Sequence, residues 1–232
     1  PAGKKTIDQI IIEKTSNIMS DNIIISKQSD NQILNKIKKN LKNNRAKKTF
    51  FSTDYNYEIN KDGFLYKDDF GVLQLPKPNL IGKHQISNTA CAVSAVRNLK
   101  KYNIKDEHII EGIKSIKNTR GRLQIIEKGS LKNLAPSNTV ICDVAHNPSA
   151  GSAISNYLDT LGKNNKIYMI CGMMDNKIHD KFLSNFKQVS EIVAVDIPNN
   201  ENCIKKETLK IIIEKIGIKS KTSNSIQEAV KY

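Results

Sequence analysis

The sequence contains no tryptophan, only 6% aromatic residues and just four cysteines. Cys91, Cys142, Cys171 and Cys203 are widely spaced and form no CxxC pair, which disfavours both a disulfide framework and a cysteine-based metal site. Cys142 and Cys171 fall within apolar runs, where a free cysteine behaves as a small hydrophobic residue. This cysteine usage fits a reducing cytoplasm.

Long apolar stretches are also missing. No run approaches the roughly 20 residues of a membrane-spanning helix. The first residues, PAGKKTIDQI, contain neither a secretory h-region nor an initiator methionine, so we expect the start to be a cut rather than a natural beginning. The 232 residues, 38% hydrophobic and 26% charged, suffice for one large domain or two small ones with cores of their own.

Arginine is scarce as well. Only Arg45, Arg97, Arg120 and Arg122 occur, so lysine supplies nearly all of the positive charge behind the net charge of +14. Surfaces that read bases or clamp phosphates favour the planar fork of arginine, which argues against a nucleic-acid partner. The densest basic segment, residues 36–48, is either a solvated helix face or a basic patch, and the solvated face is favoured because charge runs usually face water.

From residue 139 onward, short β-rich apolar segments alternate with segments whose apolar residues recur at helical spacing. TVICDV, KIYMIC and EIVAVDI predict strands, while the segments between them and residues 205–217 predict helices. This alternation predicts right-handed βαβ units and an α/β fold. We expect a Rossmann-like parallel sheet that is covered on both faces.

The first half of the chain predicts a more mixed pattern. Short strands are expected at NIIIS, KTFFS, YEI, GFLY and GVLQL, with Gly63 and Gly71 marking turns. The expected helices are residues 6–19, 30–43, 82–102 and 105–117. We place the domain boundary at the glycine-containing hinge of residues 118–122, which gives domains 1–119 and 120–232.

The segment VICDVAHNPSAG, residues 140–151, places polar residues directly after an apolar strand. Asp143 is expected at the carboxyl end of a buried parallel strand, where ligands of open α/β sheets bind. Asn147 suits the N-cap and Pro148 the first position of the next helix, whose N–H groups attract anions. A nucleotide would suit this arrangement, but these residues equally suit a simple capped turn in which His146 is an ordinary loop histidine.

Several segments together resemble one family. DVAHNPSA resembles the DxAHNP signature of the folylpolyglutamate synthase and dihydrofolate synthase family, within the Mur ligase superfamily. LIGKHQISNTACAVSAVRNL is similar to its GxHQxxNAAxAL helix, GRLQII to its GRxQ linker and MICGMMDNK to its glycine–methionine strand end, in the expected order. TIDQIIIEKTSNI looks like its TxxxIAxEKAGI helix. The resemblance implies a Rossmann-like C-terminal domain, preceded by the tail of a Mur-ligase-type central ATPase domain, with ATP between the two.

The resemblance also implies roles for individual residues. Asn88 would contact the adenine end of ATP, Arg122 the phosphates and Asp143 the ribose, while His146 and Asn147 would line the same site. Asn88 by itself is more typical of a satisfied helix-face amide. Arg122 suits phosphate because it stays charged and presents a donor fork, although a hinge arginine also suits a salt bridge between domains.

Lys14 corresponds to the family's lysine that is carbamylated to help hold Mg²⁺. Carbamylation makes physical sense there because it turns an ammonium into a carboxylate-like ligand for a hard cation. TSN replaces the family's AGI directly after this lysine, which weakens the correspondence. His84, in the KHQ segment, is expected to be structural and to orient the start of its helix.

One family element has no counterpart. No segment resembles the glycine-rich phosphate loop of the GTNGKGS kind, and AGKKT at residues 2–6 lacks the first glycine and a preceding strand, so we treat it as chance. The last residues, SIQEAVKY, resemble the helix before the family's last strand, so we expect truncation at both ends. No catalytic residue is assigned.

The resemblance therefore implies part of a cytoplasmic, ATP- and Mg²⁺-dependent ligase that adds L-glutamate to dihydropteroate or folate through an acyl phosphate. Activity of the chain alone is doubtful, and a separate N-terminal half is a candidate partner. Two alternatives stay open. One is a non-catalytic remnant that binds a nucleotide or a protein partner, and the other is a basic protein that binds nucleic acid through residues 36–48.

Overall fold

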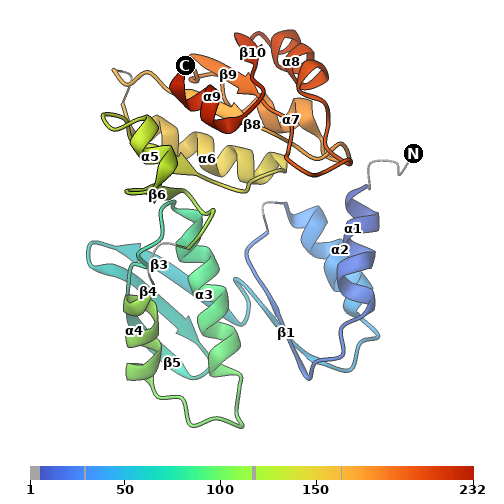
Figure 1. Cartoon of the computed structure of the whole chain (residues 1–232). Coiled ribbons are helices and arrows are strands. Elements are labelled where there is room, and N and C mark those ends of the chain that lie inside the picture. The colour runs from blue at the N-terminus through green and yellow to red at the C-terminus, as the bar shows by residue number, and fades with distance from the viewer. Residues whose placement is uncertain (1–5, 29, 117–118, 163) are drawn as a thin grey trace. The chain divides into compact units, whose positions relative to one another are not determined.

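The computed structural model describes residues 6–28, 30–116, 119–162 and 164–232. The chain folds as two compact units, which we call the N-terminal unit (described residues 6–116) and the C-terminal unit (described residues 119–232). Figure 1 shows their elements. Most of the AGKKT segment and the first residue of the expected hinge lie outside the described residues.

The N-terminal unit contains all the helices and strands expected in the first half of the sequence. Its elements are α1 (Ile7–Ser16), β1 (Asn22–Ile25), α2 (Asn31–Leu41), β2 (Lys47–Phe50), β3 (Tyr55–Asn60), β4 (Gly63–Asp68), β5 (Gly71–Pro76), α3 (His84–Arg97) and α4 (Asp106–Ser115). The first two helices begin where the sequence supplies caps. Thr6 and Gln9 form a capping box on α1, and the Asp30 side chain accepts from the Gln32 N–H at the start of α2.

Strands β1 and β2 form a two-stranded parallel sheet. Ile23 and Ile25 of β1 pack with Leu41 of α2, while Ile24 faces the opposite side and packs against the core of the antiparallel sheet described next. This alternation follows from the pleat of a strand, which sends successive side chains to opposite faces. The three isoleucines of β1 are therefore covered on both faces of the strand.

Strands β3, β4 and β5 form an antiparallel meander. One face of this sheet contributes Phe64, Tyr66 and Leu75 to a core, which α3 and α4 cover from the same side (Figure 1). Arg97, at the end of α3, forms an ion pair in which its Nε lies 3.2 Å from Asp68 Oδ2, and the two side chains are only 9% and 5% exposed. A buried ion pair thus links α3 to the end of β4.

The C-terminal unit alternates strands and helices as its sequence predicts. Its elements are β6 (Gln124–Ile126), α5 (Ser130–Leu134), β7 (Val140–Cys142), α6 (Pro148–Thr160), β8 (Tyr168–Cys171), α7 (His179–Leu183), β9 (Glu191–Ala194), α8 (Lys206–Lys215), β10 (Ser220–Thr222) and α9 (Ile226–Lys231). Strands β8, β9 and β10 form a parallel sheet in the order β10-β9-β8.

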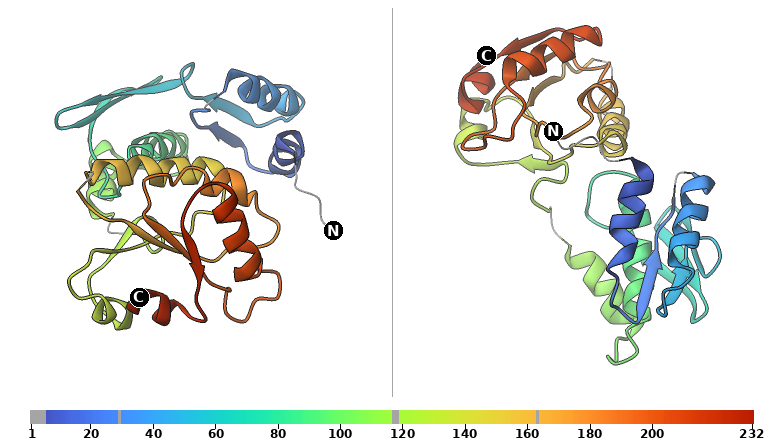
Figure 2. Two further views of the ribbon diagram at one scale, coloured as in Figure 1. Left: turned by 90° about the horizontal axis from the view of Figure 1, so that it is seen from above. Right: turned by 90° about the vertical axis from the view of Figure 1, so that its right-hand side faces the viewer.

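Helices cover both faces of this parallel sheet (Figure 2). On one face, Cys171, Ile192 and Ala194 pack with residues of α6, α7 and α8. On the other face, Val193 packs with Ala229 of α9. The predicted Rossmann-like α/β fold of this unit is confirmed.

The prediction for the strand before Asp143 was wrong in one respect. Strand β7 pairs antiparallel with β6, and its three residues are half-buried or exposed rather than buried in a parallel sheet. Cys142 is accordingly exposed, whereas Cys171 is buried in the core, and all four cysteines are free. The physical reason is that the chain turns back after β6 and places β7 beside it in the antiparallel sense. Periodicity within a segment does not reveal such a pairing. Among the described helices, none has the length and apolar character needed to cross a bilayer.

Candidate functional site

Asp143 follows β7 directly and holds two backbone groups. Its Oδ2 accepts from the Leu123 N–H at 2.7 Å, and its Oδ1 accepts from the Ala145 N–H at 2.7 Å. Both bonds are charge-assisted and short, as expected for a carboxylate acceptor. The carboxylate therefore fixes the loop after β7 and joins it to the segment before β6.

The GRLQ segment has a conformation that accounts for its glycine. Gly121 has a φ of +67°, and a Cβ atom there would lie 2.6 Å from Val144 Cγ1. The Gly121 carbonyl accepts from the Val144 N–H at 3.0 Å, and the Gly121 N–H donates to Gln124 Oε1 at 3.1 Å. Only glycine combines the positive φ with this close approach. The two family-like segments therefore interlock within the C-terminal unit.

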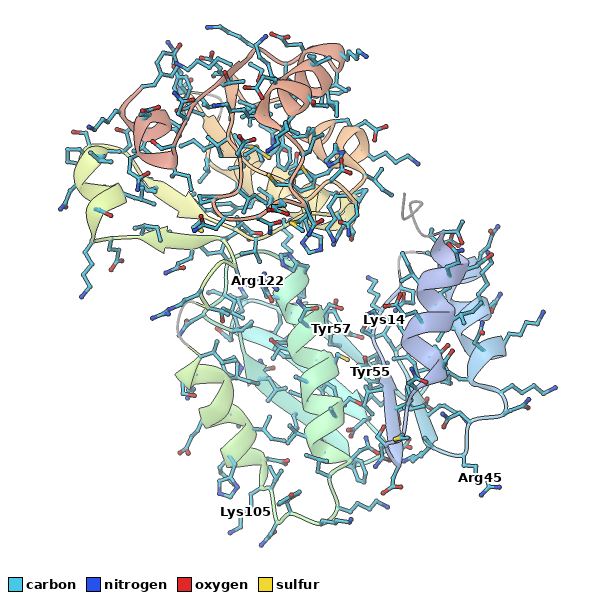
Figure 3. The ribbon with its side chains drawn as sticks, turned by 45° about the vertical axis from the view of Figure 1, so that its right-hand side comes forward. Lys14, Arg45, Tyr55, Tyr57, Lys105 and Arg122 are labelled. Atoms are coloured by element: carbon cyan, nitrogen blue, oxygen red, sulfur yellow. The ribbon has the colours of Figure 1, made fainter. Side chains whose placement is uncertain are left out.

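Arg122 lies in the same turn and is exposed. Its Nη1 donates to the Gly121 carbonyl at 3.1 Å (Figure 3 labels the residue). Within the described part of the chain this is its one side-chain hydrogen bond, which leaves the other guanidinium donors available to a ligand, because the group carries five N–H donors. The next residue, Leu123, donates its N–H to Asp143, so the backbone of Arg122 is held close to that carboxylate.

Asn147 is the N-cap of α6 and Pro148 occupies its first turn, as predicted. The Asn147 Oδ1 accepts from the Ala150 N–H at 2.9 Å. His146 is exposed, and its Nδ1 lies 3.1 Å from the Val144 carbonyl oxygen. The structural roles weighed for these residues are therefore present in the fold, and their contacts with a nucleotide stay predictions.

Gly151 of α6 packs closely against α7 and the residues that follow it. A Cβ atom on Gly151 would lie 3.0 Å from the Phe182 carbonyl oxygen and 3.0 Å from the Asn185 side-chain nitrogen. The groups that approach Gly151 are thus a backbone carbonyl of α7 and a side chain just after the end of that helix. In this part of α6 the small side chain serves helix packing.

Asn88 lies on α3 in the N-terminal unit. It is exposed, and its Nδ2 donates to Gln85 Oε1, one helical turn earlier, at 3.1 Å. Gln85 itself is buried, and its Nε2 lies 3.0 Å from His84 Nε2. His84 is the first residue of α3, in line with its expected structural role at the helix start.

A pocket of about 350 Å³ lies between α3 and α4 and includes Asn88 in its wall. Most of the wall is aliphatic, with Val93 and Val96 on α3 facing Ile109 and Ile113 on α4. Few polar side chains share this wall; these are Gln85, Asn88, Thr89 and His108. An apolar pocket with a few polar groups is the usual form of a small-molecule site.

Lys14 lies in the last turn of α1 (Figure 3). Its side chain is 75% exposed, and its Nζ lies 3.8 Å from Glu13 Oε1. No group of three or more histidine, cysteine, aspartate or glutamate residues in the described part of the chain is arranged to hold a metal ion. The metal role of Lys14 stays a prediction.

The sequence-predicted residues divide between the two units. Arg122, Asp143 and Asn147 share the loops around β7 in the C-terminal unit, whereas Lys14 and Asn88 belong to the N-terminal unit. Sequence reasoning missed two features. Leu123 has a positive φ of 46° yet is buried, and its N–H anchors Asp143. Gln85 anchors Asn88, and the HQ dipeptide at the start of α3 was the available signal for it.

Comparison with known proteins supports the resemblance. The family model of the Mur ligase, glutamate ligase domain, matches residues 121–232. UDP-N-acetylmuramate–L-alanine ligase of Clostridium acetobutylicum is 30% identical over 193 residues, which cover 76% of this chain and 39% of that ligase. Dihydrofolate synthase/folylpolyglutamate synthase of Escherichia coli is 30% identical over 125 residues, which cover 53% of this chain and 26% of that enzyme.

Solved structures show the same fold over nearly the whole chain. Escherichia coli FolC in complex with DHPP and ADP aligns with a TM-score of 0.77 and 24% identity, over 96% of this chain and 49% of that one. Mycobacterium tuberculosis folylpolyglutamate synthase complexed with ADP and AMPPCP aligns with a TM-score of 0.76 and 18% identity, over 97% of this chain and 52% of that one. The chain thus spans about half the length of these solved relatives. Residues 121–232 therefore form a Mur ligase C-terminal domain, and the chain shares its fold with the folylpolyglutamate synthases.

Proposed function

We propose that this chain forms part of an ATP-dependent carboxylate–amine ligase that joins L-glutamate to dihydropteroate or a folate. In this proposal, residues 1–119 are the C-terminal part of a central ATPase domain, and residues 120–232 are the Mur ligase C-terminal domain. The observation that carries the proposal is Asn88 in the wall of an apolar pocket of about 350 Å³, in a chain with the fold of FolC.

The pocket suits the base of ATP. Adenine is a flat ring system whose faces are apolar and whose edge carries hydrogen-bonding groups, so it needs aliphatic walls and a few well-placed polar side chains. Asn88 supplies an amide, which can form paired hydrogen bonds with the adenine edge. The aliphatic residues of α3 and α4 would contact the ring faces.

The C-terminal unit offers groups for the rest of the nucleotide. Arg122 keeps most of its guanidinium donors free for phosphate oxygens. Each oxygen of Asp143 accepts one backbone N–H and retains a second lone pair for a ribose hydroxyl. His146 and Asn147 are exposed beside it and would contact the nucleotide or the incoming glutamate.

ATP would supply the phosphoryl group that activates the acceptor carboxylate. A carboxylate oxygen of the pterin substrate attacks the γ-phosphorus, ADP leaves, and an acyl phosphate forms. The amine of glutamate then attacks the acyl carbon, inorganic phosphate leaves and an amide bond remains. In this scheme Asn88, Arg122 and Asp143 bind and orient, and no described side chain is assigned to proton transfer. We derive no step through Mg²⁺, because the described residues include no group of three or more histidine, cysteine, aspartate or glutamate side chains arranged to hold it.

The test is glutamate-dependent release of ADP with dihydropteroate or folate as acceptor. It is run with the chain alone and with an added polypeptide that carries a phosphate loop, namely the N-terminal half of E. coli FolC. Release that requires both acceptor and glutamate supports the proposal. Absence of release in both arms, with ATP binding intact, favours a non-catalytic nucleotide-binding remnant instead.

A second candidate is a ligase that adds L-alanine to UDP-N-acetylmuramate. The specific observation in its favour is the match to the C. acetobutylicum ligase, which covers 76% of this chain, against 53% for the E. coli folate enzyme. The same assay separates the two candidates when UDP-N-acetylmuramate and L-alanine replace the pterin and glutamate. ADP release with this pair alone would assign the muramate activity.

The nucleic-acid alternative finds little support in residues 36–48. Lys36 pairs with Asp8 at 2.6 Å, and Lys38 lies over the Phe50 ring at 5.0 Å from its centroid. Lys47 donates to Asn98 Oδ1 at 3.3 Å. These lysines are thus engaged within the N-terminal unit. DNA affinity that falls steeply with salt concentration would nevertheless revive this alternative.

A further inference from the structure

The hydrogen bond between Asn88 and Gln85 fixes more than a helix surface. Asn88 Nδ2 donates to Gln85 Oε1 at 3.1 Å, and both side chains form part of the wall of the pocket between α3 and α4. Gln85 is only 7% exposed, so water competes little for the hydrogen bonds of its amide. A buried amide with defined partners holds one orientation. A flip of the Gln85 amide would place its NH₂ group against the Asn88 NH₂ group, and two donors would then face each other.

The orientation of Gln85 is set on its other side by His84. Gln85 Nε2 lies 3.0 Å from His84 Nε2, and because an amide nitrogen can only donate, the imidazole nitrogen is the acceptor. Gly82 admits the ring, since a Cβ atom there would lie 2.5 Å from His84 Cε1 and the residue has a φ of +109°. The order of donors therefore runs from Asn88 to Gln85 and from Gln85 to His84.

This order determines what Asn88 can offer a ligand. One of its N–H groups is bound to Gln85, which leaves the carbonyl oxygen as an acceptor and the second N–H as a donor. An acceptor beside a donor matches the adenine edge, where the N6 amino group donates and N7 accepts. Guanine offers two acceptors, O6 and N7, at the corresponding positions. A reversed Asn88 amide, with its oxygen bound to Gln85, would present only donors and would suit guanine.

We propose that Gln85 is a positioning residue that holds the Asn88 amide in the orientation that selects a purine whose amino group lies beside N7, as in adenine. This inference rests on the proposed binding of the base by Asn88. Gln85 does not contact the base in this proposal. It accepts a hydrogen bond from Asn88 through its side-chain oxygen and thereby sets the base preference through the orientation of the Asn88 amide. The ligand class that follows is an adenine nucleotide in preference to a guanine nucleotide.

The experiment measures the dissociation constants of ATP and GTP for the full chain by equilibrium dialysis, with Mg²⁺ present. The ratio of the two constants is the readout, because changes in triphosphate binding affect both nucleotides and cancel. Gln85→Met removes the acceptor for Asn88 and should reduce the preference for ATP by about ten-fold, the effect of one lost hydrogen bond of ~1.4 kcal/mol. Gln85→Glu keeps an acceptor at this position and should retain the ratio of the wild-type chain.

Gln74→Met is the matched control. Gln74 Oε1 accepts from Asn60 Nδ2 at 2.8 Å on the antiparallel sheet, so this variant breaks the same kind of amide pair outside the pocket. It should leave the ratio unchanged. Thermal unfolding of each variant shows whether the N-terminal unit is still folded, and the Gln85→Glu variant provides the comparison if Gln85→Met is unstable.

The outcomes separate this inference from the proposed function. If Asn88→Ala abolishes the preference for ATP while Gln85→Met leaves it unchanged, Asn88 reads the base without Gln85 and the inference is overturned. If Asn88→Ala changes neither dissociation constant, the proposed base site is itself wrong and the inference falls with it. A ratio that Gln85→Glu lowers as much as Gln85→Met also contradicts the positioning role.

Discussion

The N–H of Leu123 donates to Oδ2 of Asp143 at 2.7 Å, across twenty residues of sequence. Leu123 adopts a φ of +46° to do so, which is unusual for a residue with a branched side chain. Its side chain is nevertheless buried. Together with the bond from the Val144 N–H to the Gly121 carbonyl, this bond joins the GRLQ segment to the DVAHNP segment and holds Arg122 beside the loop that follows β7.

This bond predicts the effect of Asp143→Asn. An asparagine can accept only one of the two backbone N–H groups that Asp143 binds, because its NH₂ group is a donor. We expect the free energy of unfolding to fall by about 1–3 kcal/mol, the usual cost of a partly buried donor left without an acceptor. Urea denaturation measures the change. Asp159→Asn, on the exposed side of α6, is the control and should change stability by less than about 0.5 kcal/mol.

The cap of α6 predicts a smaller effect. Asn147→Ala removes the acceptor for the Ala150 N–H and should lower the free energy of unfolding by about 1 kcal/mol. Asn147→Asp should retain the cap, since the carboxylate accepts the same bond and favours the positive end of the helix dipole. The Asn156→Ala control, inside the same helix, should be neutral or stabilising because alanine has the higher helix propensity. Equal losses in Asn147→Ala and Asn147→Asp would argue against the capping bond.

The buried pair of Arg97 and Asp68 predicts a large effect. Arg97→Met leaves the Asp68 carboxylate, with its side chain 5% exposed, without its cation, and we expect a loss of about 3–5 kcal/mol. Lys36→Met is the control, because the pair of Lys36 and Asp8 is largely exposed and contributes at most about 1 kcal/mol. Both values come from chemical denaturation of the full chain. A similar loss in the two variants would show that burial does not matter for this pair.

Cys171 predicts how stability depends on pH. Burial raises the pKa of its thiol from 9.0 to about 12, so the folded chain keeps the proton while the unfolded chain loses it. The stabilisation from this thiol is therefore fully present below pH 9 and is lost as pH rises from 9 towards 12. The free energy of unfolding of the wild-type chain should decline more steeply over this range than that of Cys171→Ala.

The control for Cys171 is the exposed Cys142. Cys142→Ala should follow the wild-type pH profile, because this substitution leaves the buried Cys171 thiol in place. Other groups that titrate in this range contribute equally to all three chains, so the difference between profiles reports the thiol alone. Parallel profiles for the wild-type chain and Cys171→Ala would contradict the burial of this thiol.

The sequence by itself determined the features that depend on residues close together in the chain, such as apolar periodicity and helix caps. Alternating apolar segments were sufficient for β8 and β9 of the parallel sheet, although not for β10. The Asn147–Pro148 pair was sufficient for the start of α6, because capping acts within a few residues. The ordered motifs were also sufficient to identify the Mur ligase C-terminal domain at residues 121–232.

Only the tertiary structure decided the pairings between distant segments. Strand β7 pairs antiparallel with β6, Leu123 binds Asp143, and α3 and α4 enclose the pocket beside Asn88. Each of these depends on where the backbone returns after a turn or a loop, which no local propensity encodes. The orientation of the Asn88 amide is a case of the same kind, because it depends on the burial of Gln85 and on the position of the His84 ring.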